Sequence, residues 1–342
     1  MISPPITDHR TPATVGDLSE RELIARIQRC LPPPPEWMPI GIGDDAAVVV
    51  PERNRLEVLS VDALVEGVHF DRAFTPPAAI GHRALAVNLS DLAAMGASPR
   101  LCLLSLVLPP EWPVHEFDEM ILGLTSLAAR NRVHVAGGNL TRSPGPLVID
   151  VTVSGSVKRR RALTRAGARP GDELYVTGAI GAAAAGLQML KAGLTAEASG
   201  PCGRQFLYPE PRVRTGTLLG RNRAASACVD LSDGLADGVQ RLAEQSGVGA
   251  VIDAGTLPIE PAARTWFDGQ AQDPMHSAIT GGDDYELLFT VRPRARGRLK
   301  AAMRPDDTPL TRIGVCTADR AVVLRGEGAG DRPMPAGYSH FR

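Results

Sequence analysis

The sequence has few lysines and lacks the glycine-rich loop that would use one to bind phosphate. Of its 37 basic residues, only Lys158, Lys191 and Lys300 are lysines. A P-loop requires the string Gly-x-x-x-x-Gly-Lys-Ser/Thr, and no such string occurs. The sequence therefore does not indicate a P-loop NTPase. If it binds nucleotide phosphates, metal ions and arginine have to neutralise them.

Long apolar segments and a secretory leader are also missing. No run of 18 apolar residues suggests a membrane span, and the N-terminal residues lack a basic region followed by an apolar one. The five cysteines are widely spaced and mostly in apolar surroundings, which predicts reduced core thiols. A net charge of −1 gives no general attraction to nucleic acid or membranes. We expect a cytoplasmic protein without nucleic-acid or membrane partners.

The length of the chain and its hydrophobic content predict two domains. A chain of 342 residues with 44% hydrophobic content can build two cores of ordinary size. The arginine-rich stretch near 158–172 is the best boundary, so we predict domains at 1–157 and 158–342. The spacing predicts helices near 18–30, 78–97, 114–130, 181–191 and 233–246, and strands near 56–65, 101–108, 133–138, 147–157, 173–177, 228–231, 285–291 and 311–316.

Five short acidic motifs are spread along the chain, each with a carboxylate among glycines, serines or small apolar residues. They are Gly41-Ile-Gly-Asp-Asp45, Ser60-Val-Asp62, Asn88-Leu-Ser-Asp91, Asp230-Leu-Ser-Asp233 and Gly281-Gly-Asp-Asp284. Each ends or follows an apolar run, and buried carboxylates are costly unless a positive group meets them. This pattern indicates a cation site assembled from distant segments. Oxygen ligands suit Mg²⁺, and clustered Mg²⁺ is typical of phosphate chemistry.

One of these patterns is repeated. A Leu-Ser-Asp core occurs at 89–91 and again at 231–233, one copy in each predicted domain. The repeat is too short to establish a duplication. It suggests that both domains present similar acidic turns towards one cleft.

Each acidic motif also has a purely structural interpretation. The motifs at 41–45 and 281–284 are turn signals when taken alone. Asp233 could cap the helix that follows it, although capping leaves Asp230 unexplained. Asp91 lies in a run of alanines and leucines, where a metal ligand and a buried pair are equally supported. Asp62 is a modest candidate.

Three other segments are structural by default. His69 is more often a satisfied structural histidine than a site residue. Arg165 belongs to a basic linker that begins at Lys158-Arg-Arg-Arg161 and is typically solvated. Gly137-Gly-Asn139 has the composition of a tight turn. No single motif is decisive, but the occurrence of all these motifs in one chain indicates that the residues form a functional site.

In this order and spacing, the motifs resemble the thiamine-monophosphate kinase family. That family belongs to a superfamily with aminoimidazole ribonucleotide synthetase, selenophosphate synthetase and the hydrogenase-maturation dehydratase. The resemblance runs from about Leu18 to Phe341. Its most specific strings lie at 41–47, 86–97, 161–165, 230–235, 281–287 and 337–341.

The resemblance implies an α/β fold of the α+β type with two domains. The N-terminal domain would hold a mixed or antiparallel sheet with helices and pair in a homodimer, and the C-terminal domain would be an α/β sandwich. The activity implied is phosphorylation of thiamine monophosphate by ATP, with several Mg²⁺ ions. Because the acceptor phosphate is already anionic, direct in-line transfer without a general base is expected.

The resemblance also assigns roles to individual residues. Metal ligands would be Asp45, Ser60, Asp62, Asp91, Asp230 and Asp233. Contacts to ATP would come from Gly138, Arg165 and Ser232. Contacts to thiamine monophosphate would come from His69, Asp283 and Tyr338, with Tyr338 stacking on an aromatic ring.

Two positions depart from the family pattern. Val61 replaces a common threonine, and Asn139 replaces a common aspartate beside the ATP contact. Val61 could still bind metal through its backbone carbonyl, and Asn139 through its amide oxygen. One negative charge is lost, so we expect one metal position of lower affinity.

Two other functions stay open. A related enzyme of the superfamily could use a different acceptor. Alternatively, the chain could be a regulatory protein that binds Mg·ATP but lost catalysis when Val61 and Asn139 appeared.

Overall fold

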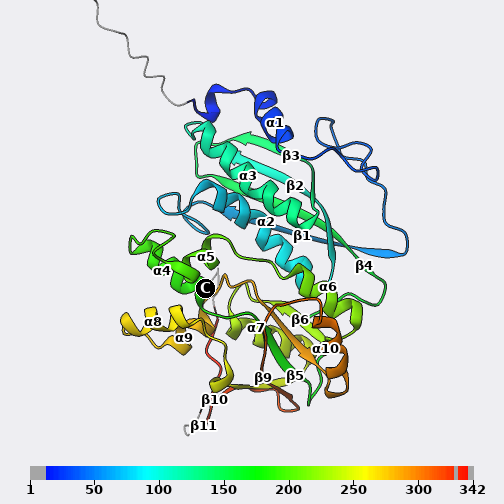
Figure 1. Ribbon diagram of the computed structural model, residues 1–342, viewed down its shortest axis with the longest axis vertical. Coiled ribbons are helices and arrows are strands. Elements are labelled where there is room, and N and C mark those ends of the chain that lie inside the picture. Colours follow the sequence, from blue (N-terminus) through cyan, green and yellow to red (C-terminus); the bar gives the residue numbers. More distant parts are fainter. Residues whose placement is uncertain (1–12, 327–329, 338–342) are drawn as a thin grey trace, which may run out of the picture.

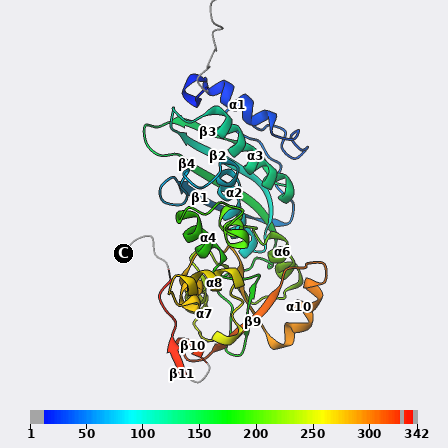
Figure 2. The same cartoon turned by 60° about the vertical axis from the view of Figure 1, so that its left-hand side comes forward.

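The computed structural model describes residues 13–326 and 330–337 and contains two β-sheets, each with its own helices. Figures 1 and 2 show the N-terminal elements in one half of the molecule and the C-terminal elements in the other. This confirms the expected two-domain α/β fold. The first sheet ends at Lys158 and the second begins at Glu173, and the exact boundary at 157/158 stays a prediction.

The N-terminal domain is built around a four-stranded mixed sheet of order β1-β4-β2-β3. β4 pairs antiparallel with β1 and β2, whereas β2 and β3 are parallel. Helices α2 and α3 pack together against one face of this sheet (Figure 1). The elements are α1 (Glu20–Arg29), β1 (Arg55–Val65), α2 (Pro77–Ala94), β2 (Ser98–Leu108), α3 (Val114–Asn131), β3 (His134–Arg142) and β4 (Val148–Lys158).

The C-terminal domain contains a seven-stranded sheet of order β11-β10-β7-β9-β5-β8-β6. Its strands are β5 (Glu173–Thr177), β6 (Ala227–Asp230), β7 (Gly249–Asp253), β8 (Leu287–Val291), β9 (Leu310–Thr317), β10 (Val322–Gly326) and β11 (Gly330–Pro333). Its helices are α4 (Ala182–Lys191), α5 (Gly200–Leu207), α6 (Val213–Asn222), α7 (Leu235–Ser246), α8 (Pro261–Gly269), α9 (Pro274–Thr280) and α10 (Arg296–Met303).

Most elements follow from local sequence patterns. α7 buries Leu235, Val239 and Leu242 at helical spacing and ends at Gly247, whose positive φ of 68° suits glycine. The turn expected at 137–139 is wrong, because β3 continues through these residues to Arg142. Their pairing with β2, after a register shift at Cys102/Leu103, outweighs the local turn preference of glycine and asparagine.

Two further sequence expectations concern membranes and thiols. Within residues 13–326 and 330–337, no helix is long and apolar enough to cross a membrane. All five cysteines are free, and all except Cys30 are buried. Burial raises the pKa of the Cys102 thiol to about 12, so it stays protonated at neutral pH. The expected core position is confirmed for these four cysteines, and their reduced state stays a prediction.

Helix α2 lies where the two domains meet (Figures 1 and 2). It is buried from Ala79 to Ser90 and carries apolar residues around most of its circumference. A helix that is apolar on all sides needs partners on all sides. α2 accordingly contacts β1 and α3 of its own domain and α6 and β6 of the other.

Glycines allow the backbones of these helices to approach closely. A Cβ atom on Gly81 of α2 would lie 1.8 Å from the carbonyl oxygen of Met120 in α3. One on Gly216 of α6 would lie 1.9 Å from the carbonyl oxygen of Ala93 in α2. Because the blocking atoms belong to backbones, a small rotamer change cannot relieve either clash. These positions therefore fix how α2 is seated between the domains.

We predict that Gly81→Ala and Gly216→Ala each lower the free energy of unfolding by about 2 kcal/mol or more, because each overpacks a helix crossing. Denaturant unfolding of the purified variants measures the change. Gly297→Ala is the matched control: this helical glycine in α10 has open space around it. The control should be neutral or stabilising by about 0.5–1 kcal/mol. Equal stability of Gly81→Ala and wild type would contradict the close-packing argument.

Candidate active site at the domain junction

The acidic residues of β1 and α2 meet on the covered face of the N-terminal sheet. Ser60 and Asp62 are two residues apart on β1, so their side chains point to the same face. The Ser60 hydroxyl donates a hydrogen bond to the carboxylate of Asp91, which lies in the last turn of α2. The sheet and the helix therefore bring two separate sequence motifs into direct contact.

A second contact joins this group to the C-terminal domain. Asp230 is the last residue of β6, and its carboxylate accepts a hydrogen bond of 2.8 Å from the Ser90 hydroxyl of α2. The two Leu-Ser-Asp copies thus meet across the domain junction. The expectation of two similar acidic turns is wrong for the first copy, because Ser90 and Asp91 lie inside a helix. Only 231–234 is a loop, between β6 and α7.

Four aspartates at this junction are close enough to repel one another electrostatically. We call them the acidic cluster: Asp62, Asp91, Asp230 and Asp233. The pKa of Asp62 is raised to about 6 by burial of its carboxyl group, with further contributions from Asp91, Asp150 and Asp233, although much of the residue stays exposed. The pKa of Asp230 is raised to about 7, mainly by burial and then by the charge of Asp91. The metal-free cluster therefore holds more negative charge than its surroundings compensate.

Two arginines offset part of this charge. Arg165 lowers the pKa of Asp230 through its positive charge, which places it within electrostatic range of the cluster. Arg241 on α7 donates a hydrogen bond of 2.9 Å to Asp233 and pairs at 2.5 Å with Asp237, one turn away on the same helix. Asp233 is therefore an ion-pair partner and not the cap of α7, whose N-cap residue is Gly234.

The fourth and fifth motifs pack against each other through their backbones. The Asp283 N–H donates to the Ser232 carbonyl at 2.7 Å, and a Cβ atom on Gly282 would lie 2.5 Å from that same oxygen. Gly234 similarly approaches the carbonyl of Gly281. Glycine is therefore needed in both motifs for close packing of the two loops, because a side chain at either position would push them apart.

The two aspartates of the fifth motif have different surroundings. Asp284 is buried and accepts hydrogen bonds from the Gly181 and Ala183 N–H groups at the start of α4, so it is structural. Burial raises its pKa to about 8. Asp283 has a left-handed φ of 68° and accepts hydrogen bonds from Arg83 at 3.1 Å and from the Tyr285 hydroxyl at 2.9 Å. Only Asp283 is half-exposed and able to contact a substrate.

Other expected site residues lie outside the acidic cluster. Asp45 is on an exposed loop before β1, where its N–H donates to Asp44. His69 follows β1, and its Nδ1 accepts a hydrogen bond of 3.1 Å from the Val65 N–H. Tyr338 lies outside the residues that the structure describes.

Three expected residues lie elsewhere on the N-terminal sheet. Val61 points to the face opposite Ser60 and Asp62 and is 56% exposed, so only its backbone remains near the cluster. Gly138 and Asn139 are on β3, and two strands separate β3 from β1. At about 4.8 Å per strand, this spacing is about 14 Å. Gly138 also has a structural reason, because a Cβ atom there would meet the Leu104 carbonyl oxygen at 1.8 Å.

The sequence analysis missed Ser90, Arg83 and Asp150. Arg83 is the clearest omission: it is 1% exposed within α2, its guanidinium donates to the Phe206 carbonyl and to Asp283, and it lies over the Phe206 ring. A long arginine side chain in the alanine- and leucine-rich stretch 77–94 was the available signal. Asp150 left no local signal, because it alternates with core residues of β4 and only strand pairing places it near Asp62.

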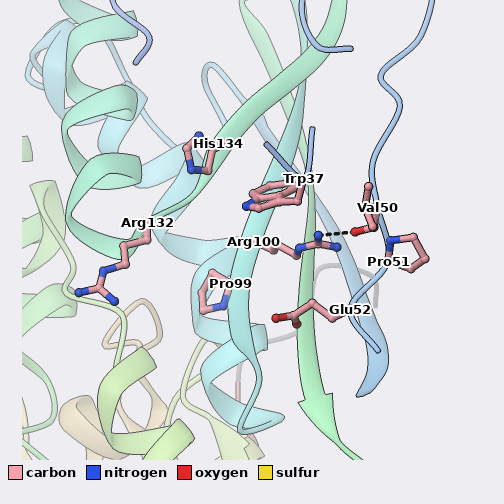
Figure 3. Close-up of a pocket in the computed structure, with 8 residues that line it drawn as sticks. All are labelled: Trp37, Val50, Pro51, Glu52, Pro99, Arg100, Arg132 and His134. Atoms are coloured by element: carbon pink, nitrogen blue, oxygen red, sulfur yellow. Dashed lines mark hydrogen bonds between the residues drawn. The ribbon is translucent and has the colours of Figure 1, made fainter. Parts of the chain in front are cut away.

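A cavity of about 440 Å³ lies apart from the acidic cluster, on the N-terminal domain. Figure 3 shows its lining, in which the guanidinium of Arg100 stacks over the Trp37 ring at 4.2 Å and donates to the Val50 carbonyl. None of its lining residues belongs to an acidic motif. In the described part of the chain, no group of three or more His, Cys, Asp or Glu side chains is arranged closely enough to hold a metal ion.

Comparison with known proteins places this fold in a class. The AIR synthase related protein N-terminal domain matches residues 43–157, and the corresponding C-terminal domain matches residues 169–327. Because these two matches cover most of both domains, the chain belongs to the AIR synthase related class.

Individual relatives narrow the class to one family. The chain is 35% identical to a thiamine-monophosphate kinase of Bacillus subtilis, over 89% of this chain and 94% of that protein. A crystal structure of a thiamine-monophosphate kinase from Stenotrophomonas maltophilia has a TM-score of 0.80 and 39% identity, covering 91% of this chain and 98% of the other. A structure of AaThiL complexed with AMPPCP and TMP has a TM-score of 0.75 and 31% identity, covering 88% and 92%. The chain belongs to the thiamine-monophosphate kinase family.

The raised pKa of Asp230 predicts that the metal-free protein loses stability as the pH rises. An unfolded aspartate has a pKa of about 3.9, and Asp230 has one of about 7 in the fold. Between these values the native state binds a proton that the unfolded state releases, so the free energy of unfolding falls with rising pH. Asp230→Asn keeps an acceptor for Ser90 and should weaken this dependence.

Thermal unfolding in EDTA at about pH 5 and pH 8 tests this prediction. We expect Asp230→Asn to raise the Tm more at pH 8 than at pH 5, because only part of the window between the two pKa values has been crossed at pH 5. Asp268→Asn, an exposed carboxylate on α8, is the control and should follow wild type at both pH values. An equal effect of Asp230→Asn at both pH values would contradict the assignment.

Proposed function

We propose that this chain transfers the γ-phosphoryl group of ATP to the phosphate of thiamine monophosphate and so forms thiamine diphosphate. The observation that carries the proposal is the contact of Ser90 with Asp230, which joins acidic motifs of both domains into one cluster. Family membership supports the substrate pair, because one structural relative was solved with AMPPCP and TMP. ATP is then the co-substrate.

The oxygen ligands available at the cluster suit Mg²⁺. Hydroxyl and carboxylate oxygens surround the junction, and the raised pKa values of Asp62 and Asp230 indicate negative charge that a cation would relieve. Mg²⁺ usually binds through one or two carboxylates, waters and substrate phosphates, without a complete protein cage. This mode of coordination fits the acidic cluster, in which no three carboxylates are close enough to bind one metal ion without other ligands.

The residues proposed to hold Mg²⁺ are Ser60, Asp62, Asp91, Asp230 and Asp233. Asp45, Val61 through its carbonyl and Asn139 are proposed to complete the set from more distant positions. When bound, Mg²⁺ would neutralise phosphate charge; like charges 4 Å apart repel by about 4 kcal/mol at an effective dielectric near 20.

The other side chains of the site would bind and orient the two substrates. Arg165 is exposed beside the cluster and is proposed to contact ATP, together with Gly138, Asn139 and Ser232. Asp283 is proposed to contact thiamine monophosphate from the position that Arg83 and Tyr285 fix. His69 and Tyr338 are proposed to complete that contact. A general base is not needed, because the acceptor phosphate is already ionised.

We also propose a homodimer, formed through the face of the N-terminal sheet that α2 and α3 leave uncovered. On this face Leu59 is 70% exposed, Val61 56% and Leu103 41%. Val61 and Leu103 both lie opposite Thr152 of β4, so they flank Thr152 on the same face of the sheet. Exposed apolar side chains gathered on one face are typical of an interface. The four buried thiols fit a reducing compartment, and we propose a cytoplasmic location.

Leu59→Lys should shift the protein from dimer to monomer, because a charge would be buried at the proposed interface. Analytical ultracentrifugation of the variant and wild type at matched concentrations measures the shift. Leu122→Lys is the control, since Leu122 is 58% exposed on α3 of the same domain. A wild type that sediments as a monomer would overturn the dimer, and a dimeric Leu59→Lys variant would exclude this face.

Incubation of the chain with ATP, Mg²⁺ and thiamine monophosphate should give thiamine diphosphate, detected by chromatography. We expect Asp91→Asn to lose at least about 100-fold in turnover, since it removes the charge of a proposed Mg²⁺ ligand. Asp268→Asn should stay active, and thermal unfolding verifies that both variants fold.

The outcomes of this assay separate the alternatives. ATP consumption that requires a different acceptor would favour a related enzyme of the superfamily. Binding of Mg·ATP without any turnover by wild type would favour a regulatory protein. Near-normal activity of Asp91→Asn would remove Asp91 from the site while leaving the reaction in place.

A further inference from the structure

A second cavity, of about 450 Å³, lies just beyond the C-terminal end of α2. Four of its lining residues are basic, namely Arg55, Lys158, Arg161 and Arg221, and none is acidic. The hydroxyl groups of Ser98 and Thr217 also line it. We call this cavity the basic pocket. It shares no lining residue with the acidic cluster or with the sites proposed for ATP and thiamine monophosphate.

The walls of the basic pocket come from both domains. Arg55 and Lys158 are directly paired at one end of β1 and β4. Arg221 is on α6 of the C-terminal domain, which contacts α2 and β2 (Figure 1). Arg161 belongs to the connecting segment, and its guanidinium donates a hydrogen bond of 2.9 Å to the Arg221 carbonyl. The pocket is therefore built by tertiary packing and is more than a solvated basic linker.

Most of the positive charge in the basic pocket has no counter-charge. Arg55 forms an ion pair of 3.1 Å with Glu52 and donates to the Ser156 hydroxyl at 2.8 Å. Within the described part of the chain, Lys158, Arg161 and Arg221 form no ion pair. Like charges that line one concave surface add their fields and concentrate anions there. An anion from outside would relieve this repulsion.

The size and chemistry of the pocket select the class of anion. Guanidinium groups bind phosphate oxygens with two parallel hydrogen bonds, and lysine adds a point charge. Three cations without a counter-charge exceed what one phosphate group needs, and the volume is that of a small-molecule site. We propose that the basic pocket binds a small molecule with two or more linked phosphate groups. A nucleic acid fits less well, because the positive charge is confined to one cavity of a nearly neutral chain.

Calorimetric titration of the full chain with inorganic pyrophosphate in EDTA tests the proposal. EDTA removes divalent cations, so the acidic cluster repels the probe and only a metal-independent site can bind it. We expect binding by wild type and a loss of about tenfold or more in affinity for Arg161→Gln/Arg221→Gln.

The control pair Arg159→Gln/Arg169→Gln makes the same change in net charge with two exposed residues of the same segment that do not line the pocket. It should keep its affinity to within about twofold, because exposed charges outside the pocket are screened by salt. Thermal unfolding verifies folding, and Lys158→Gln, at an exposed position, replaces the double variant if that variant is unfolded.

Three results would overturn the proposal: no binding of pyrophosphate by wild type, an equal loss in the pocket and control variants, or an unchanged affinity in the pocket variant. Titration with a short DNA duplex separates the macromolecular alternative. Duplex binding that depends on the pocket arginines, without pyrophosphate binding, would identify a nucleic-acid surface instead. Because the titration contains neither metal nor nucleotide, its failure is independent of the kinase assay.

Discussion

The burial of helix α2 between the two domains is the constraint on which the rest of the structure depends. A helix with apolar side chains on nearly every side is stable only if protein surrounds it, and two domains together provide that environment. Gly81 and Gly216 let α3 and α6 approach it to backbone contact. The same helix carries Arg83, Ser90 and Asp91 to the junction. Fold stability and placement of the site therefore rest on one element.

Charge is separated by sign around the end of α2. Asp91 lies in its last turn within the acidic cluster, while Gly96 lines the basic pocket. Gly96 follows Asp91 by only five residues, just after α2 ends at Ala94, so regions of opposite charge lie close together. A net charge of −1 hides this separation. The acidic side is partly neutralised by Arg165 and Arg241, whereas on the basic side Glu52 pairs with Arg55. Ions or ligands of opposite charge would complete each region.

Several residues of the family motifs hold loops and strands together. Gly138, Gly234 and Gly282 each sit where a Cβ atom would strike a neighbouring backbone oxygen. Asp284 caps the start of α4, and Arg83 fixes Asp283. These contacts explain why the motifs contain glycine and paired aspartates even before any ligand is considered. Assigning every motif residue to ligand binding would overstate the number of direct contacts.

The elements with a clear local residue pattern could be predicted from the sequence alone. Helical spacing identified α7, small helix-favouring residues identified α2, alternation identified β4, and the family motifs identified the fold and most of the acidic cluster. The sequence patterns did not identify the elements α5, α6, α8, α9, α10, β7, β10 and β11. They also misassigned the strand at Gly137–Asn139 as a turn, since pairing with β2 overrides local preference. Contacts between distant segments could not be predicted in this way, namely those of Ser90 with Asp230 and of Arg83 with Asp283, or the effect of the Asp150 charge on Asp62. Local patterns record spacing along one segment, whereas hydrogen bonds, charge repulsion and pocket walls depend on distances between segments that only packing sets.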